Sequence, residues 1–245
     1  MSEHIPSRQL RFFVTAEAPC PYLPDRMERK VFANLPVREG PEVNDALTQA
    51  GFRRSQNIAY RPACETCALC VSVRIPVDRF IASRTNRKTI SRNTDLKRSI
   101  VDPIATTEQY ELLKRYLSAR HPDGGMNEMS EDDFVTMIED SAVRTHIVEY
   151  RLPIEGAERS QLIGFALIDF LSDGLSMVYS AFDPEHVKRS LGRFIVLDHI
   201  YQARTIGIPY VYLGYWVQGS ASMDYKSQYQ PLEALGLFGW QPLKP

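Results

Sequence analysis

The sequence predicts an α+β fold built on a mixed sheet, and the second half of the chain carries the pattern that predicts it. Apolar runs bounded by turn residues predict strands at 145–150, 162–170 and 175–182. A long helical stretch follows at 187–206, where Gly207 ends it, and 209–215 has the composition of a last core strand. Because a strand, a helix and a second strand in succession join parallel neighbours, residues 175–215 predict one crossover unit in an otherwise hairpin-rich sheet.

Two further helices in this half are marked by their caps. Thr106 or Thr107 can cap a helix that continues to Arg120 and stops at the Pro-Asp-Gly-Gly turn 122–125. Ser130 opens another helix, whose first turn holds the acids at 131–133, where the helix dipole favours negative charge.

The first hundred residues are irregular and rich in Pro and Arg. Their apolar spacing predicts one helix at 42–49, which Gly51 ends. Two strands are expected at 58–61 and 71–75. The cysteines of the chain lead into the second of these strands.

The composition is that of a soluble globular protein with room for two domains. The chain has 245 residues and a formal net charge of −1, and no apolar run approaches the ~20 residues that a membrane span needs. Its first residues lack a signal-peptide pattern, so we expect a cytoplasmic protein whose cysteines are reduced thiols or metal ligands. The composition changes at Asp102-Pro103, which predicts an N-terminal domain over 1–101 and a C-terminal domain over 102–245.

The small net charge conceals a cationic segment between Arg79 and Arg98. Seven Lys and Arg side chains stand against one acid, Asp95, in this segment. Such a segment can bind phosphates, but charge runs are more commonly solvated surface, so this observation alone leaves nucleic-acid binding open.

A second cationic feature lies in the turn between the strand at 175–182 and the helix that follows. This turn contains Lys188, Arg189, Ser190, Gly192 and Arg193. The first N–H groups of a helix are free and the dipole there is positive, so the added cations predict a site for phosphate or another anion. A basic cap on a surface helix is the alternative.

Three cysteines lie close together in Cys64-x2-Cys67-x2-Cys70, and Cys20 is the fourth. Four thiolates suit tetrahedral zinc or an iron–sulfur cluster, and the spacing does not choose between them. The alternative is that these small side chains only pack a turn.

The tail from 212 to 231 is rich in aromatic and small residues. Aromatic side chains beside Gly and Lys can form a pocket for a base, although ordinary core packing is the stronger interpretation of the spacing alone. The chain has no Walker-type or dinucleotide-type glycine loop and no catalytic-triad spacing of histidines, which disfavours a nucleotide kinase or a dehydrogenase.

Several short motifs follow one another along nearly the whole chain. They are Pro19-Cys20-Pro21-Tyr22, Gly51-Phe52-Arg53-Arg54-Ser55, Tyr60-Arg61-Pro62, the three cysteines with Val73-Arg74-Ile75, Ser176-x2-Tyr179, Asp183-Pro184, Arg189-Ser190-Leu191-Gly192, Gly214-Tyr215-Trp216 and Met223-x-Tyr225-Lys226 to Pro231. In this order they resemble the arginyl-tRNA–protein transferase family, and most of all its short bacterial branch of aspartate/glutamate leucyltransferases. The long insertions of the eukaryotic arginyltransferases are absent, which favours the bacterial branch.

The resemblance implies a small cysteine-containing N-terminal domain and a C-terminal GNAT-type acyltransferase domain with a mixed sheet. It implies aminoacyl transfer from the 3′ ester of Leu-tRNA to the α-amino group of proteins that begin with Asp or Glu, which marks them for degradation by the N-degron pathway. The turn at 188–193 would then face the 3′ end of the charged tRNA instead of a cofactor pyrophosphate. Leucine follows from the family branch alone, so arginine stays open as the donor.

The implied reaction needs little base strength, because the ester is activated and an α-amine has a pKa of roughly 8. Asp169, or a water that it orients, is our candidate proton acceptor, and a structural acid is the equal alternative. Recognition of an acidic first residue requires a cation, so we expect one or two of Arg53, Arg54, Arg61 and Arg74 to bind the acceptor carboxylate. Structural ion pairs are the competing role.

Around the donor adenosine and the aminoacyl group we expect Tyr179, Tyr215, Trp216, Tyr225 and Lys226, of which Tyr179 and Lys226 are also catalytic candidates. The resemblance implies that the cysteine site holds an iron–sulfur cluster, zinc or nothing, and that transfer requires no cofactor. Two other function classes stay open. One is a non-catalytic RNA-binding module that a metal at the cysteines stabilises. The other is an acetyl-CoA-dependent acetyltransferase, although the complete glycine-rich motif that binds the cofactor pyrophosphate in such enzymes is absent.

Overall fold

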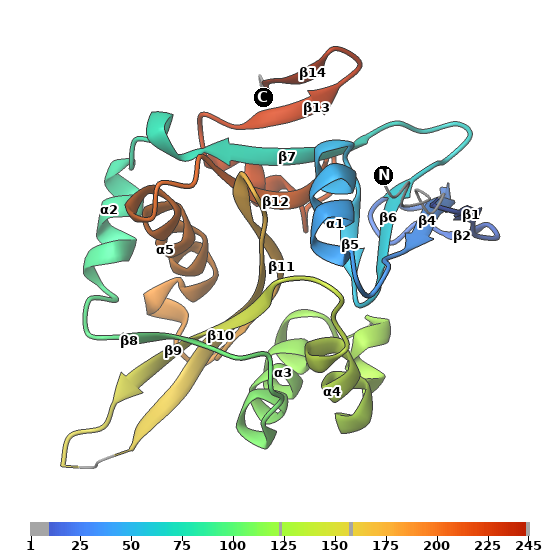
Figure 1. The fold of residues 1–245 in the computed structure, drawn as a ribbon. Helices are drawn as coiled ribbons and strands as arrows, with labels where there is room; N and C mark the ends of the chain where they lie inside the picture. Colours follow the sequence, from blue (N-terminus) through green and yellow to red (C-terminus); the bar gives the residue numbers. More distant parts are fainter. Residues whose placement is uncertain (1–9, 123, 157–158, 244–245) are drawn as a thin grey trace, which may run out of the picture.

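The computed structural model describes residues 10–122, 124–156 and 159–243. Figure 1 shows an eight-stranded sheet at the centre, with helices on both of its faces and a smaller N-terminal sheet beside it. The strand order of the larger sheet is β14-β13-β7-β12-β11-β10-β9-β8. These strands are β7(Cys70–Pro76), β8(Lys97–Val101), β9(Thr145–Pro153), β10(Ser160–Phe170), β11(Gly174–Phe182), β12(Tyr210–Val217), β13(Glu233–Gly236) and β14(Gly239–Pro242). Among the described residues, no helix is long and apolar enough to cross a membrane.

The larger sheet is mixed, as expected for an α+β protein with a GNAT-type domain. Strands β11 and β12 pair in parallel, and the other neighbouring pairs are antiparallel. The crossover between β11 and β12 is the helix α5(Leu191–Thr205). The crossover unit predicted at 175–215 is therefore confirmed.

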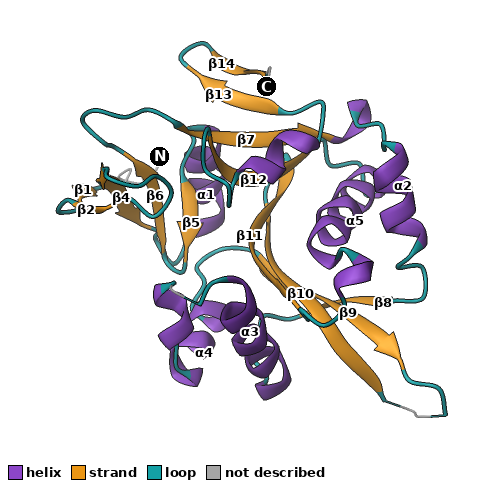
Figure 2. Ribbon diagram, turned by 180° about the vertical axis from the view of Figure 1, so that it is seen from behind, coloured by secondary structure: helices purple, strands orange, loops and turns teal. Residues whose placement is uncertain are grey.

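Helices cover both faces of this sheet and bury its apolar side chains (Figure 2). One face carries α3(Thr107–Arg120) and α4(Glu131–Glu139), and the other carries α5 and α2(Arg84–Ser91). The side chains of Thr106 and Ser130 accept hydrogen bonds from the third backbone N–H of their helices, which confirms both predicted caps. Short 3-10 turns are η1(Val77–Arg79), η2(Gly125–Glu128), η3(Val187–Arg189) and η4(Asp224–Gln228).

The smaller sheet has the strand order β1-β4-β6-β5 and packs against α1(Gly40–Gln49). Its strands are β1(Phe12–Val14), β4(Lys30–Asn34), β5(Arg53–Ser55) and β6(Ile58–Pro62), and a short hairpin joins β2(Ala18–Pro19) to β3(Met27–Glu28). β7 follows this sheet in the chain but belongs to the larger one, where it pairs with β12 and β13. The larger sheet thus takes strands from both sides of residue 101, and the division at that residue stays a prediction.

One predicted helix differs in its start. The sequence predicts a helix over 187–206, whereas η3 covers Val187–Arg189 and α5 begins at Leu191. Ser190 separates them in the left-handed region, at φ 53°. This conformation breaks the helical ladder and turns the chain onto the sheet.

Candidate active site

The centre of the site is the opening between the parallel strands β11 and β12. Among the described residues, the two strands pair with each other only at Gly174–Tyr210, Leu175–Val211 and Ser176–Tyr212. Their carboxyl ends continue to Phe182 and Val217 without pairing to one another, which leaves backbone groups free there. In α/β sheets, ligands bind outside the carboxyl ends of the strands.

Arg53 of β5 enters this opening from the smaller sheet. Its Nη2 donates to the carbonyl oxygen of Val178 on β11. On the opposite strand a Cβ at Gly214 would lie only 2.8 Å from Nη1 of Arg53, and Gly214 itself has φ 72°. A side chain at position 214 would therefore displace the guanidinium, so only glycine allows this close approach. Among the described residues, no carboxylate pairs with half-buried Arg53, whereas charges removed from water are ordinarily paired.

Two of the other three candidate arginines have protein carboxylates as partners. Arg54 is paired with Asp169, and Arg74 donates from Nε to Glu233 at 2.9 Å. The Arg74 guanidinium also lies 4.4 Å from the ring centroid of Trp240 on β14, so it anchors the C-terminal hairpin. Arg61 is exposed, 5.3 Å from the ring centroid of Phe52. Arg53 is thus the half-buried candidate that has no carboxylate partner among the described residues.

Asp169 lies in a buried network on β10. Its Oδ2 accepts from Arg54 Nε at 2.6 Å, and its Oδ1 accepts from Arg54 Nη2 at 2.7 Å and from Thr145 Oγ1 at 2.8 Å. Asp169 is 0% exposed. Because both oxygens are occupied and none faces the opening, this geometry favours the structural alternative over the general-base hypothesis.

Lys226 lies on the β12 side of the opening. It is 3% exposed, and its Nζ donates to the Tyr215 carbonyl oxygen at 2.5 Å. Burial and the neighbouring Arg53 charge hold the pKa of Lys226 well below its usual value. The lysine therefore has a tendency to be neutral, the form that accepts a proton.

Several tyrosines surround Arg53. Burial raises the pKa of Tyr179 on β11 above its usual range, and Arg53 opposes this rise. Burial also raises the pKa of Tyr22 to about 12, with Tyr60 adding to the rise and Arg53 opposing it. The Tyr215 hydroxyl lies 2.9 Å from the carbonyl oxygens of Gly51 and Tyr60, so it joins the smaller sheet to β12. These phenols stay protonated at neutral pH and can donate hydrogen bonds.

The remaining tail candidates differ in their surroundings. Tyr225 is 45% exposed, with the Arg53 charge nearby. The Trp216 side chain packs against the core cluster under α5, as the core interpretation of the tail predicts. Its role in binding a donor adenosine stays a prediction without geometric support.

The predicted anion loop lies at the N-terminus of α5. The Ser190 carbonyl accepts from the N–H groups of Arg193 and Phe194 at 3.0 Å, so the two preceding N–H groups lie outside the helical ladder. A Cβ at Gly192 would lie 2.8 Å from Phe182, so glycine lets α5 begin directly against β11. Lys188 is exposed, whereas Arg193 donates to Gln228 at 2.7 Å.

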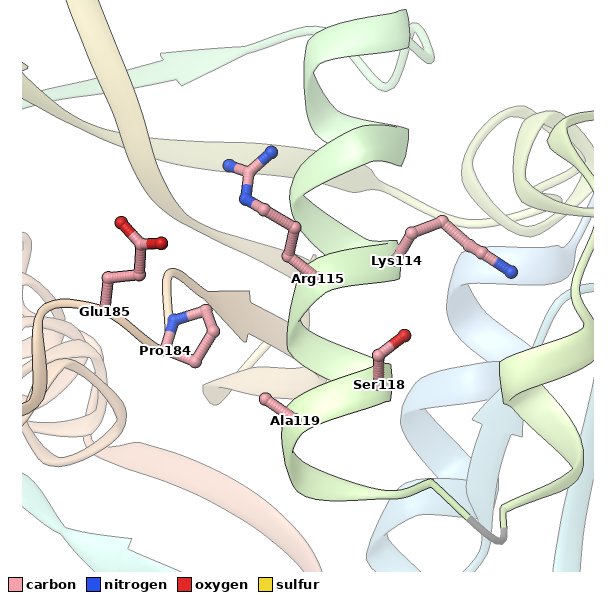
Figure 3. A pocket seen from close by; sticks show the side chains of 6 residues that line it. All are labelled: Lys114, Arg115, Ser118, Ala119, Pro184 and Glu185. Atoms are coloured by element: carbon pink, nitrogen blue, oxygen red, sulfur yellow. The ribbon is translucent and has the colours of Figure 1, made fainter.

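A groove of about 520 Å³ lies beside this loop, between α3 and the segment after β11 (Figure 3). Arg115 and Glu185 lie on opposite sides of it, whereas Lys114 points to the other side of α3, where its Nζ donates to the Asn127 carbonyl oxygen at 2.7 Å. Arg115 lies 3.5 Å from the buried carboxylate of Asp183, which holds the loop against α3. The sequence motifs did not single out α3, because its polar residues resemble those of any amphipathic surface helix.

The four cysteines are free thiols that gather near Cys70. Burial, with Cys20, Cys64 and Cys67 nearby, raises the pKa of Cys70 to about 11. In the described part of the chain, no three His, Cys, Asp or Glu side chains converge to hold a metal.

Comparison with known proteins gives two matching family models. The model described as "Arginine-tRNA-protein transferase, C terminus" matches residues 108–236, and the corresponding N-terminus model matches residues 18–88. An aspartate/glutamate leucyltransferase of Phenylobacterium zucineum is 59% identical over 240 residues, which cover 98% of this chain and 93% of that protein. One of Caulobacter vibrioides is also 59% identical, and the match covers 98% of this chain and 86% of that protein.

Among solved structures, the crystal structure of FemX is similar in fold. The TM-score is 0.51 at 10% identity, and the match covers 82% of this chain and 67% of that chain. At this identity the likeness bears on the fold alone.

Proposed function

Because the chain belongs to the arginine-tRNA-protein transferase family, we propose that it transfers leucine from Leu-tRNA to the α-amino group of proteins that begin with Asp or Glu. The near-full-length identity to aspartate/glutamate leucyltransferases supports leucine as the donor. The observation that supports acceptors with an acidic first residue is the position of Arg53, a half-buried cation in the strand opening. An acidic first residue would supply the carboxylate that this guanidinium lacks in the described chain.

The proposed reaction takes place in the opening between β11 and β12. The acceptor nitrogen attacks the ester carbonyl carbon, the bond from that carbon to the tRNA 3′ oxygen breaks, and one amine proton passes to Lys226 and then to the leaving oxygen. Protonated Tyr179 donates a hydrogen bond to the developing oxyanion. The free N–H groups at the start of α5, with Lys188, hold the phosphates at the tRNA 3′ end.

Lys226→Met should lower kcat about tenfold at pH 7, because only about a tenth of an α-amine with a pKa near 8 is neutral without assistance. The lowered pKa of Lys226 gives the sign of the pH dependence. Its neutral fraction grows as pH rises through that pKa, so wild-type activity should rise with pH there, and Lys226→Met should lose this rise. Initial rates between pH 5.5 and about 9 measure both curves. Parallel curves with equal kcat would remove Lys226 from proton transfer.

The function is tested by incubating the protein with an Asp-starting peptide and labelled Leu-tRNA, Arg-tRNA or acetyl-CoA. We expect label only from Leu-tRNA. Label from Arg-tRNA alone would favour the arginyl donor, and label from acetyl-CoA an acetyltransferase. Absence of label from all three would favour the non-catalytic RNA-binding alternative.

We further propose that this transfer requires no cofactor, and that an iron–sulfur cluster or zinc at Cys20, Cys64, Cys67 and Cys70 has at most a structural role. Four thiols gathered near Cys70 support the donor chemistry of such a site. The same transfer assay on chelator-dialysed protein tests the first statement. Visible absorbance and metal content after anaerobic purification test the second. We also propose that the protein acts in the cytoplasm.

A further inference from the structure

The two cationic segments of the sequence form one surface. The helix α2 packs beside α5, and its end meets the loop before α5 (Figure 1). Arg92 Nη1 donates to the Lys188 carbonyl oxygen at 3.2 Å, and Asn93 Nδ2 donates to the Arg189 carbonyl oxygen at 2.9 Å. These contacts join residues 96 apart in the chain. The predicted anion loop therefore continues directly into α2.

The outer face of α2 is cationic. Asn86 and Thr89 are buried against the protein, whereas Arg84 is exposed on the opposite face together with Arg87 and Lys88, which follow it by three and four residues. Among the described residues, no carboxylate lies within ion-pair distance of Arg84 or Lys88. We call the exposed side chains of Arg84, Arg87, Lys88 and Arg92 the α2 cation strip. Arg84 and Lys88 are free to bind phosphates, and Arg87 and Arg92 each donate one hydrogen bond to a backbone carbonyl oxygen and keep their other donors.

Arg189 has a different environment from this strip. Its two terminal nitrogens donate to both oxygens of Asp95, at 2.8 and 2.7 Å, and Nη1 also donates to the Arg92 carbonyl oxygen at 2.9 Å. Its side chain is only 20% exposed. The guanidinium is thus occupied by the protein and fastens the loop to the end of α2.

We propose that the α2 cation strip binds the phosphate backbone of the duplex acceptor stem of the donor RNA, while the Arg189–Asp95 pair positions the anion loop against that duplex. This inference rests on the proposed function, because it describes how the same donor is held. α2 contains no aromatic residue, and single-stranded RNA is ordinarily bound on aromatic stacking platforms. A-form duplexes, by contrast, are recognised through their phosphates and 2′-hydroxyls. The strip suits the duplex, and Arg189 acts as a positioning residue instead of a phosphate ligand.

The strip is tested with Arg84→Gln/Lys88→Gln and three probes: uncharged leucine tRNA, its acceptor-stem minihelix, and a single-stranded oligonucleotide ending in CCA. Affinity for the first two should fall roughly tenfold, and the slope of log affinity against log salt should fall by about 2, about one unit per cation. Affinity for the single strand should not change. The matched control is Arg38→Gln/Arg159→Gln, two exposed arginines in the loops before α1 and between β9 and β10. A loss no larger than that of the control, or an equal loss on the single strand, would overturn the proposal.

The positioning role is tested with Asp95→Asn. Whether this variant binds RNA more tightly or more weakly than the wild type distinguishes the two possible roles of Arg189. Removing an acid and freeing a cation should tighten RNA binding if Arg189 is a direct phosphate ligand. If the pair positions the loop, minihelix affinity should instead fall about fivefold with an unchanged salt slope. Tighter or unchanged binding contradicts the positioning role.

Leucyl transfer by the wild-type protein is measured in the same buffer. If the wild type transfers no leucine, the proposed function fails whatever the variants bind. If it transfers leucine and both variants behave as the control does, only this inference fails.

Discussion

Arg53→Gln should lower kcat/KM for an Asp-starting peptide about 10²- to 10⁴-fold, because it removes two charge-assisted hydrogen bonds of about 1.5–3 kcal/mol each. Glutamine keeps a polar side chain without charge, but its amide nitrogen lies two atoms short of the guanidinium nitrogen that donates to the Val178 carbonyl oxygen. The low rate on an Ala-starting peptide should change much less, since that acceptor has no side-chain carboxylate. The measurement is the initial rate on Asp-, Glu- and Ala-starting peptides at saturating Leu-tRNA.

The control is Arg38→Gln, an exposed arginine before α1, which should change these rates less than about twofold. Equal losses on all three peptides, together with a higher KM for Leu-tRNA, would assign Arg53 to the donor instead. Arg53→Lys should recover only part of the loss, because an ammonium keeps the charge but lacks the planar fork.

Asp169→Ala should destabilise the protein by about 3–5 kcal/mol, because it leaves the Arg54 charge buried without its partner. Both side chains are only 1% exposed, so water cannot replace the lost carboxylate. Their pairing joins β5 of the smaller sheet to β10 of the larger one, so we expect β5 to loosen first. Urea denaturation of the wild type and the variant measures the loss.

The double variant Arg54→Met/Asp169→Leu separates structure from catalysis. Replacing a buried ion pair by apolar side chains of similar size costs little or is even stabilising, so this variant should regain most of the lost stability. If Asp169 only holds β5, the folded double variant should transfer leucine within about threefold of the wild type. A stable double variant whose kcat is about 10² or more below the wild type would return Asp169 to the reacting groups.

Local sequence signals predicted most elements of the larger sheet. The caps at Thr106 and Ser130, the strands β9 to β12 and the crossover helix all depend on near neighbours along the chain. The edge strands were missed for a physical reason. β1, for example, is exposed at all three positions and so has no alternation of buried and exposed residues.

The candidate site shows a similar division. The chemistry of acceptor recognition placed Arg53, Arg54, Arg61 and Arg74 in one group of candidate acceptor ligands, and composition alone gave no reason to separate them. Their partners distinguish them: Asp169 is 115 residues from Arg54, and Glu233 is 159 residues from Arg74. Neither separation leaves a periodic signal in the sequence.

The sequence by itself thus determined the family, the reaction class and the crossover unit, because motifs and periodicity are local properties of the chain. Only the tertiary structure decided which cations are neutralised within the protein and which remain free for a substrate. Arg189 and Lys188 are adjacent in the sequence, yet one is paired with Asp95 and the other is exposed. An ion pair depends on distances of a few ångströms between side chains, and folding sets these distances by bringing remote segments together.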